Sequence, residues 1–520
     1  MRELEGLIGL VLAAVVVAAA ARRVGAPYPV FLALGGALLA FLPGAPTLIV
    51  PPELALAIFI APVLLDAAYD ASPRDLRDNW APVLSLVVFA VGLTTVAVAV
   101  VVHALIPAMS WAPAIALGAI VAPPDAAAAT AVLRGLRPPQ RLLTILEGES
   151  LLNDASALLI YRLAVGAVAA NGFSIQAVAP TFLFAVAGSI VAGPALGWLF
   201  LRLIGRVQHV PTAIILQFAT TFGVWILADR IGLSAVLTMV CYAVTVARSA
   251  PERTPARIRI PSYAVWESAV FLLNILAFIF IGLQIRPIID RIEPALRDRY
   301  VFVAGAVLVT VIVVRIAWHM SFNAVVRWRD RQHGFNPPRP MLRPTVGSGL
   351  VVSWAGMRGI VSLAAALALP GAFPFRDLIV LTAFSVVVGT LVIQGLTLKA
   401  LLRALNLQDD DPVGRELASA RARALSAGLA SFERDRSPVA DAVREEFTAH
   451  LAPSDANRDG DGRHAAHNDI HRGALQAARQ AVIDMRTNDE IGDDAFHQME
   501  EELDWLEMAG GGNEELESRD

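Results

Sequence analysis

A short polar stretch interrupts the apolar segment 142–170, and it holds the side chains best suited to chemistry. Glu149, Ser150, Asn153 and Asp154 lie within it, among otherwise mostly hydrophobic residues. On a helix, Ser150 and Asp154 share one face because they are four residues apart, and Glu149 and Asn153 share the neighbouring face. The spacing therefore predicts one helix that carries carboxylate, hydroxyl and amide groups on adjoining faces.

The depth of Asp154 decides what this stretch can do. Asp154 lies 13 residues beyond Arg141, which is roughly 20 Å of helix in a hydrocarbon layer about 30 Å thick. An ionisable side chain near the midplane costs at least about 2.5 kcal/mol to insert, so it needs a partner, a proton or an ion. The alternative is a buried polar network that only holds helices together.

The composition indicates that these helices span a membrane. Of the 520 residues, 56% are hydrophobic and 17% are charged, and the mean hydropathy is +0.59, which is too apolar for a soluble enzyme. We expect an all-α polytopic membrane protein with about 13 transmembrane helices. The first lacks a small-residue cleavage site and is expected to be retained. The expected spans are 5–21, 28–43, 47–69, 80–106, 111–133, 142–170, 177–201, 211–228, 231–247, 263–285, 300–325, 345–370 and 376–403.

The loops between these spans differ in basic residues, and the difference predicts the topology. One alternating set of loops holds 20 Lys and Arg residues and the other holds 6. Loops rich in Lys and Arg remain in the cytoplasm. We therefore expect a multi-pass protein of the cytoplasmic membrane with its N-terminus outside and its C-terminal tail inside.

The tail, residues 404–520, differs from the membrane domain, residues 1–403, in charge and hydropathy. It carries 12 basic and 27 acidic residues, whereas the membrane domain carries 30 basic and 19 acidic ones. Helical runs are expected near 414–432, 438–451, 470–487 and 493–508. We expect a mostly helical cytoplasmic tail with a regulatory or structural role.

The fifth span is expected to break in mid-membrane. It contains Ala122, Pro123, Pro124 and Asp125 in succession, and two prolines remove two amide donors, so the helix cannot continue. Asp125 can cap the half that follows. The free carbonyls of Ala122, Pro123 and Pro124 and a positive helix end can then line a small-ion site. A simple proline kink is the alternative.

The twelfth span is expected to break as well. Gly356 and Gly359 flank Arg358 halfway through an apolar segment, which places a permanent cation at depth. Arg358 needs an anion, and Glu149 is the candidate, because that pair leaves Asp154 able to exchange its charge. Broken spans at positions five and twelve of thirteen suggest paired, inverted structural repeats.

Other features limit the possible chemistry. Asp66 lies about a turn inside the cytoplasmic end of the third span, where it is either an interfacial acid without a role or part of the site. Cys241 is the single cysteine, and no glycine-rich phosphate loop is present. We therefore expect a protein that is not an enzyme, with no catalytic residues, no cofactor, no bound metal and no nucleic-acid partner.

Several motifs together resemble one family. The 148–154 stretch, the 353–362 segment with its Gly-Met-Arg-Gly core, the 278–284 run and the 122–125 break are similar to those of the monovalent cation:proton antiporter-1 family, the NhaP-like bacterial sodium/proton antiporters. The resemblance covers nearly the whole membrane domain. It implies a homodimer in the lipid bilayer, in which each protomer has a dimerisation domain and a moving core domain that together give alternating access.

The resemblance also implies residue roles. Asp154 looks like the carboxylate that binds a cation or a proton, Ser150 and Asp66 look like further oxygen ligands, and Asn153 looks like a neighbouring stabiliser. Glu149 and Arg358 take the place of the structural ion pair.

Two positions depart from the family pattern. Asp66 stands where the family usually has Glu, and Pro124-Asp125-Ala126 stands where it usually has Thr-Asp-Pro. A threonine hydroxyl is therefore missing from the break, and only backbone carbonyls can contribute there.

The function implied is exchange of a monovalent cation, with sodium as the first choice, for protons, without net charge movement. The alternatives are potassium/proton exchange on the same fold and a passive cation channel.

Overall fold

A computed structural model describes residues 2–23, 26–42, 51–133, 138–169, 175–334, 343–407, 412–435, 437–451 and scattered positions between 474 and 505. The regular elements that it describes are all helices. The chain divides into two compact units, Met1–Asp410 and Asp411–Asp520. The expected boundary at residue 403 lies seven residues before this division.

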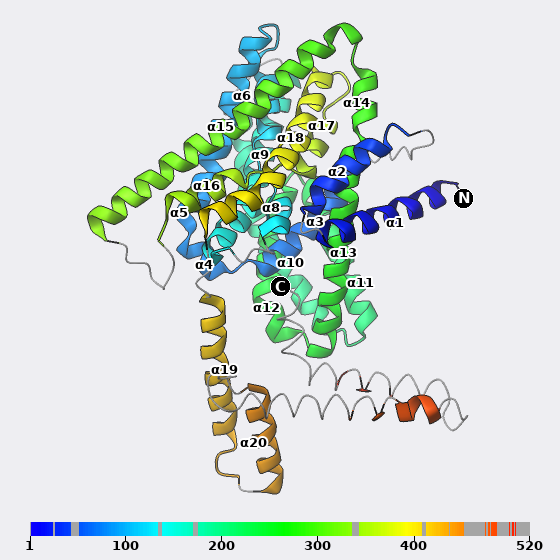
Figure 1. Cartoon of the computed structure of the whole chain (residues 1–520), viewed down its shortest axis with the longest axis vertical. Coiled ribbons are helices and arrows are strands. Elements are labelled where there is room, and N and C mark those ends of the chain that lie inside the picture. Colours follow the sequence, from blue (N-terminus) through cyan, green and yellow to red (C-terminus); the bar gives the residue numbers. More distant parts are fainter. Residues whose placement is uncertain are drawn as a thin grey trace. The chain divides into compact units, whose positions relative to one another are not determined.

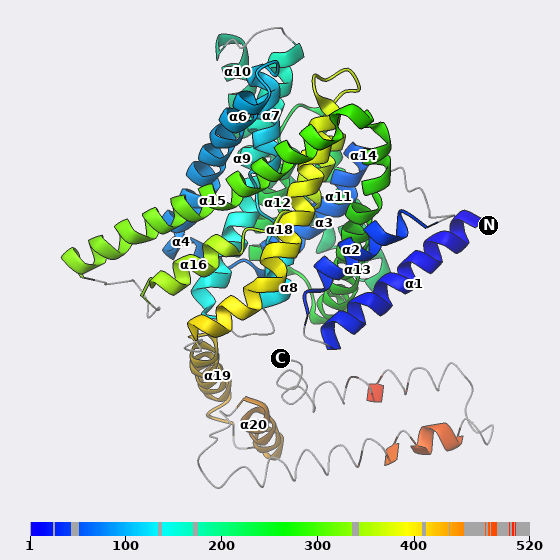
Figure 2. The ribbon, with the colours of Figure 1, turned by 45° about the horizontal axis from the view of Figure 1, so that its top comes forward.

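Unit 1 contains the apolar helices (Figures 1 and 2). In chain order they are α1 (Arg2–Arg23), α2 (Tyr28–Leu39), α3 (Pro52–Asp70), α4 (Pro73–Asp78), α5 (Trp80–Leu84), the π-helix η1 (Ser85–Ala90), α6 (Val91–Leu105), α7 (Trp111–Val121), α8 (Ala126–Leu133), α9 (Gln140–Ala169), α10 (Ile175–Ile204), α11 (Val210–Arg230), α12 (Ala235–Arg253), α13 (Ala256–Leu283), α14 (Ile285–Arg291), α15 (Pro294–His333), α16 (Val346–Trp354), α17 (Ile360–Leu367) and α18 (Arg376–Leu405).

The helices follow the expected spans. Each of the thirteen predicted segments coincides with one helix or with consecutive helices. Seven described helices are long and apolar enough to cross a membrane by length and composition, and four further apolar helices are shorter. The all-helical membrane architecture is therefore confirmed, although length and composition alone identify fewer than thirteen full spans.

Both predicted breaks are present. α7 ends at Val121 and α8 begins at Ala126, because the two intervening prolines have no N–H to continue the helix. α16 ends at Trp354 and α17 begins at Ile360, after extended backbone at Gly359 (φ −128°, ψ −156°).

Unit 1 is held together by two large apolar clusters. The first cluster joins buried residues of α1, α2, the start of α3, η1, α6–α9, the second half of α13, α14 and α15–α18. The second cluster joins α3 with α10–α12 and the first half of α13. Helix α9 belongs to both, because Leu146 lies in the first cluster, Leu151 lies in the second, and Leu158 packs against each.

Close helix contacts fix this arrangement. Figures 1 and 2 show α2 beside α13 and α15 crossing α18, and both pairs are in contact. A Cβ on Gly282 of α13 would overlap the backbone of Ala33 and Ala37 in α2. Glycine is therefore required there, because any side chain would push the two helices apart.

A π-helical turn, η1, was not expected from the sequence. The carbonyl of Ser85 accepts a hydrogen bond from Trp318 Nε1 of α15 at 3.2 Å, and that of Val87 accepts from Ser156 Oγ of α9 at 2.9 Å. π-Helical turns leave carbonyl groups available to partners outside the helix. This turn connects the fourth span to α9 and α15.

In unit 2, the described helices are α19 (Pro412–Ser431) and α20 (Pro438–Leu451), which contact each other. They coincide with the first two expected tail helices. Of the expected run 470–487, residues 474, 477, 478 and 480–485 are described and are helical, whereas the expected run 493–508 lies mostly outside the described residues.

Candidate functional site

Helix α9 brings the polar stretch into the interior of unit 1. Glu149 is 1% exposed, Asn153 is fully buried and Asp154 is 8% exposed. The Nδ2 of Asn153 donates a hydrogen bond to the carbonyl of Pro124 at 2.8 Å. This bond places the middle of α9 against the break between α7 and α8.

Asp154 differs from the neighbouring polar residues because its carboxylate lacks a hydrogen-bond donor among the described residues. Asp125 is near enough to repel it when both are ionised. A buried carboxylate with a like-charged neighbour favours a proton or a cation as its partner.

The two broken helices cross next to this carboxylate. The N–H of Asp125 donates to the carbonyl of Met357 at 2.6 Å. In the other direction, Arg358 donates from Nε to the carbonyl of Val121 at 3.1 Å and from Nη2 to that of Ala122 at 3.2 Å. The guanidinium therefore lies at the negative end of α7, where it balances carbonyls that have no helical partner.

Asp125 lies at the positive end of α8, on the other side of the break from the end of α7. Its Oδ1 accepts a hydrogen bond from the N–H of Ala127 at 2.8 Å, which caps the start of α8. A Cβ on Gly359 would overlap the carboxylate of Asp125. The absence of a side chain at residue 359 allows the two breaks to approach this closely.

The prediction that Glu149 pairs with Arg358 is wrong. Glu149 pairs with Arg315 of α15, with Oε1 2.5 Å from Nη1 and Oε2 2.8 Å from Nη2. Arg315 is 3% exposed. The buried carboxylate is thus satisfied by a two-pronged pair with α15, while Arg358 bonds to backbone carbonyls.

Arg315 is the residue of the site that the sequence did not assign. It also donates from Nε to the carbonyl of Ser353 and from Nη2 to that of Val352, both at 3.1 Å. The signal was its position in the interior of the 300–325 span, where snorkelling to the surface and pairing were both possible. Its contacts connect α9, α15 and α16.

The other oxygen ligands that the sequence predicts lie on α9, on α3 and in the break between α7 and α8. The carbonyls of Ala122 and Pro124 each accept a hydrogen bond from a protein donor, and Pro123 lies buried between them. Ser150 is half-buried on α9. Asp66 is half-buried on α3, a helix that packs against α9.

A buried carboxylate beside two crossed, broken helices is the architecture of a secondary transporter. A comparison with family models agrees, because the model "sodium/hydrogen exchanger, transmembrane" matches residues 10–404. The chain belongs to the sodium/hydrogen exchanger family.

Two bacterial relatives illustrate the similarity. An uncharacterised Na(+)/H(+) exchanger of Mycobacterium tuberculosis is 33% identical over 96% of this chain and 95% of its own length. A protein of Bacillus subtilis named sodium, potassium, lithium and rubidium/H(+) antiporter is 31% identical over 72% of this chain and 58% of its own length.

The fold is similar to a solved structure. The sodium proton antiporter NhaP1 of Methanocaldococcus jannaschii superposes with a TM-score of 0.58 over 78% of this chain and 99% of that one. The sequence identity is 17%, so this likeness concerns the fold alone.

Proposed function

We propose that the protein exchanges a monovalent cation for protons by alternating access, with sodium as the first choice and no net charge moved. The carboxylate of Asp154 carries this proposal. It is buried beside both helix breaks and accepts no hydrogen bond from the described residues. If the carboxylate holds either a cation or a proton, and the protein moves only when it is neutralised, competition for one charge couples the two flows.

The two apolar clusters support alternating access. Leu151 and Leu158 lie on either side of Asp154 along α9, the first in the second cluster and the other in contact with both. A relative movement of the clusters would therefore change access at Asp154. We assign the moving core to the helices of the first cluster that surround the crossed breaks.

The proposed ligands are hard oxygen atoms, which sodium and potassium prefer. Asp154 supplies the carboxylate, with Ser150, Asp66 and the carbonyls at residues 122–124 as further oxygen ligands. Asn153 holds the break in place through Pro124. Potassium/proton exchange is the second candidate, because the Bacillus subtilis relative is named for four alkali cations.

The proposed setting is the cytoplasmic membrane, with the N-terminus outside and the tail inside. The asymmetry of basic residues between alternate loops supports this orientation. We also propose a homodimer, with residues 1–403 as the exchanger and residues 404–520 as a regulatory or structural tail.

Purified protein in vesicles tests the function. An imposed sodium gradient is expected to drive protons against their own gradient, and repeating the assay with potassium and lithium ranks the cations. A passive channel would conduct without coupling, so no uphill proton movement would occur.

Asp154→Asn is expected to abolish exchange, because the amide cannot bind a proton and a cation alternately. Asp229→Asn, which neutralises an exposed acid on α11, serves as the control for folding and insertion. Full cation-dependent proton flux in Asp154→Asn would refute the assignment.

A further inference from the structure

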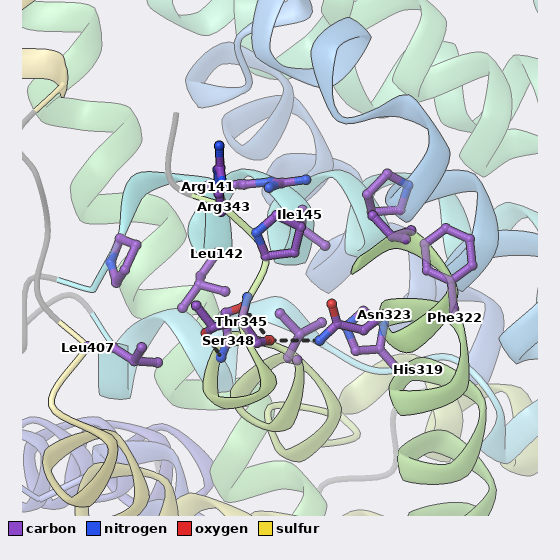
Figure 3. Close-up of a pocket in the computed structure, with 16 residues that line it drawn as sticks. Arg141, Leu142, Ile145, His319, Phe322, Asn323, Arg343, Thr345, Ser348 and Leu407 are labelled. Atoms are coloured by element: carbon purple, nitrogen blue, oxygen red, sulfur yellow. Dashed lines mark hydrogen bonds between the residues drawn. The ribbon is translucent and has the colours of Figure 1, made fainter. Parts of the chain in front are cut away.

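A largely apolar cavity of about 350 Å³ lies at the end of unit 1 where α9 and α16 begin. Its walls include Leu142 and Ile145 of α9, Phe322 and Val326 of α15, and Val352 of α16 (Figure 3). The last turns of α15, which also lines this cavity, carry Arg327, Arg329 and Arg331. The cavity is separate from Asp154, which does not line it.

A buried histidine lines the same cavity. His319 of α15 is 5% exposed, and its Nδ1 has no hydrogen-bond partner. Neither ring nitrogen bonds to any residue that the structure describes. Leaving a buried polar group without a hydrogen bond is unfavourable, so an occupant with a hydrogen-bonding atom would be stabilised here.

Two arginines give the cavity a positive edge. Figure 3 shows Arg141 and Arg343 at the same side of the cavity, away from His319 and Phe322. Arg141 donates from Nε to Asn79 Oδ1 at 3.0 Å, which fixes the orientation of its guanidinium. Each guanidinium has five N–H donors in a plane, so it can bind an anion in addition to its protein partners.

We propose that this cavity binds an anionic phospholipid of the surrounding bilayer. The phosphate lies against Arg141 and Arg343, an ester oxygen accepts a hydrogen bond from the ring of His319, and an acyl chain fills the apolar part. An amphiphile matches the combination of apolar walls, one buried polar group and a cationic edge. The bilayer also supplies such molecules permanently, and their negative charge favours the basic face of the protein.

The occupant would contact the supports of the transport site. Val352 lines the cavity, and its carbonyl accepts a hydrogen bond from Arg315. Ile145 lies one turn before Glu149 on α9. A bound lipid would therefore hold together α9, α15 and α16, the three helices that Glu149 and Arg315 connect.

Native mass spectrometry of the full chain tests the binding without any transport assay. Phosphatidylglycerol is expected to remain bound, and phosphatidylcholine is not. Arg141→Gln together with Arg343→Gln is expected to weaken binding about 25-fold, since each arginine at an anionic surface contributes roughly a factor of five. Arg329→Gln with Arg331→Gln removes the same charge from the exposed end of α15 and is expected to leave binding unchanged.

Two further measurements distinguish binding of the acyl chain from binding of the headgroup. Val326→Phe fills the apolar part and is expected to reduce lipid binding while the protein unfolds at an unchanged temperature. Glycerol phosphate, which has the headgroup charge but no acyl chain, is expected to compete poorly. Equal binding by the double arginine variant and its control, or effective competition by glycerol phosphate, would overturn the lipid site. Neither result would bear on Asp154.

Discussion

At the scale of single residues, Glu149 and Arg315 show how a charge is accommodated inside the bundle. The two side chains are almost completely buried and meet through two hydrogen bonds. Both charges lose their hydration on insertion, so each depends on the other. The pair connects α9 with α15, and it does not involve Asp154.

Replacing Arg315 with Met is expected to lower the free energy of unfolding by about 3–5 kcal/mol, because Glu149 would be left buried without a partner. Thermal unfolding of the purified protein measures the loss. Arg162→Gln breaks an ion pair with Asp229 whose side chains are 49% and 55% exposed, and it is expected to cost less than about 1 kcal/mol. Similar losses in the two variants would contradict this account of Glu149.

The sequence identified Glu149 and Arg358 as charges of the site, but it did not assign Arg315 or the correct pairing. Glu149 and Arg358 lie at depth in apolar segments, so each was expected to need compensation. The choice of partner depends on how α15 is rotated and on how the break before α17 turns Arg358 toward α7. Neither rotation follows from spacing along one helix.

Gly359→Ala is expected to impair exchange and lower thermal stability, because the new Cβ would displace the carboxylate of Asp125 from the start of α8. Gly223→Ala is the matched control, since a Cβ at that position on α11 meets no atom within 4 Å. It is expected to leave stability equal or raise it by up to about 1 kcal/mol. Unimpaired exchange in Gly359→Ala would show that the two breaks can separate without loss.

At the scale of helices, Arg358 connects elements that the chain itself interrupts. It reaches the end of α7 through Val121 and Ala122, and it also donates to the carbonyl of Gly356 in its own break. Its backbone N–H donates to Thr390 Oγ1 of α18 at 3.0 Å. One residue therefore joins three helices at the crossing.

Arg358→Lys is expected to destabilise the protein by about 3 kcal/mol or more and to reduce exchange strongly. A lysine has one nitrogen, whereas the three nitrogens of the planar guanidinium donate to three separate carbonyls. A lysine therefore cannot make all three hydrogen bonds. Arg376→Lys is the control, because Arg376 also donates to helix-end carbonyls, those of Leu367 and Leu369, at a distance from the site. Equal exchange in both variants would argue against the bridging role.

The same principle explains the arginines in the loops that are poor in basic residues. Arg286 donates to the carbonyl of Ala40, at the end of α2, and Arg299 to that of Leu105, at the end of α6. Positive side chains at helix C-termini stabilise exposed carbonyls. Arg286 and Arg299 therefore have a local role at helix ends, which accounts for their presence in loops with few basic residues.

Helix existence and helix breaks were predictable because their causes are local. Pro123 and Pro124 prevent a helix whatever surrounds them, and long apolar runs predict spans. The π-helical turn at Ser85–Ala90 was not predictable. It depends on Trp318 and Ser156, which approach from other helices and bind its carbonyls.

At the scale of the whole molecule, the chain consists of a membrane unit that matches the family and a tail unit that extends beyond it. The family match ends at residue 404, α18 ends at Leu405, and the first compact unit ends at Asp410. The boundaries from the family match and from the structure therefore fall within a few residues of each other.

A chain that ends at Asp410 is expected to insert, fold and exchange ions, because both apolar clusters lie before that residue. Vesicle assays of the shortened and full-length proteins measure the difference, and a change limited to rate or pH dependence would fit a regulatory tail. Loss of the folded membrane unit after removal of residues 411–520 would show that the units are not separable.

The point of attachment of the tail has a mechanical consequence. α18 is the last helix before the tail, and its Thr390 hydroxyl accepts the backbone N–H of Arg358. A partner that binds the tail and exerts force on it would displace α18 before any other helix of unit 1. A force on residues 411–520 would thus reach Arg358, which joins the two interrupted helices, through α18 alone.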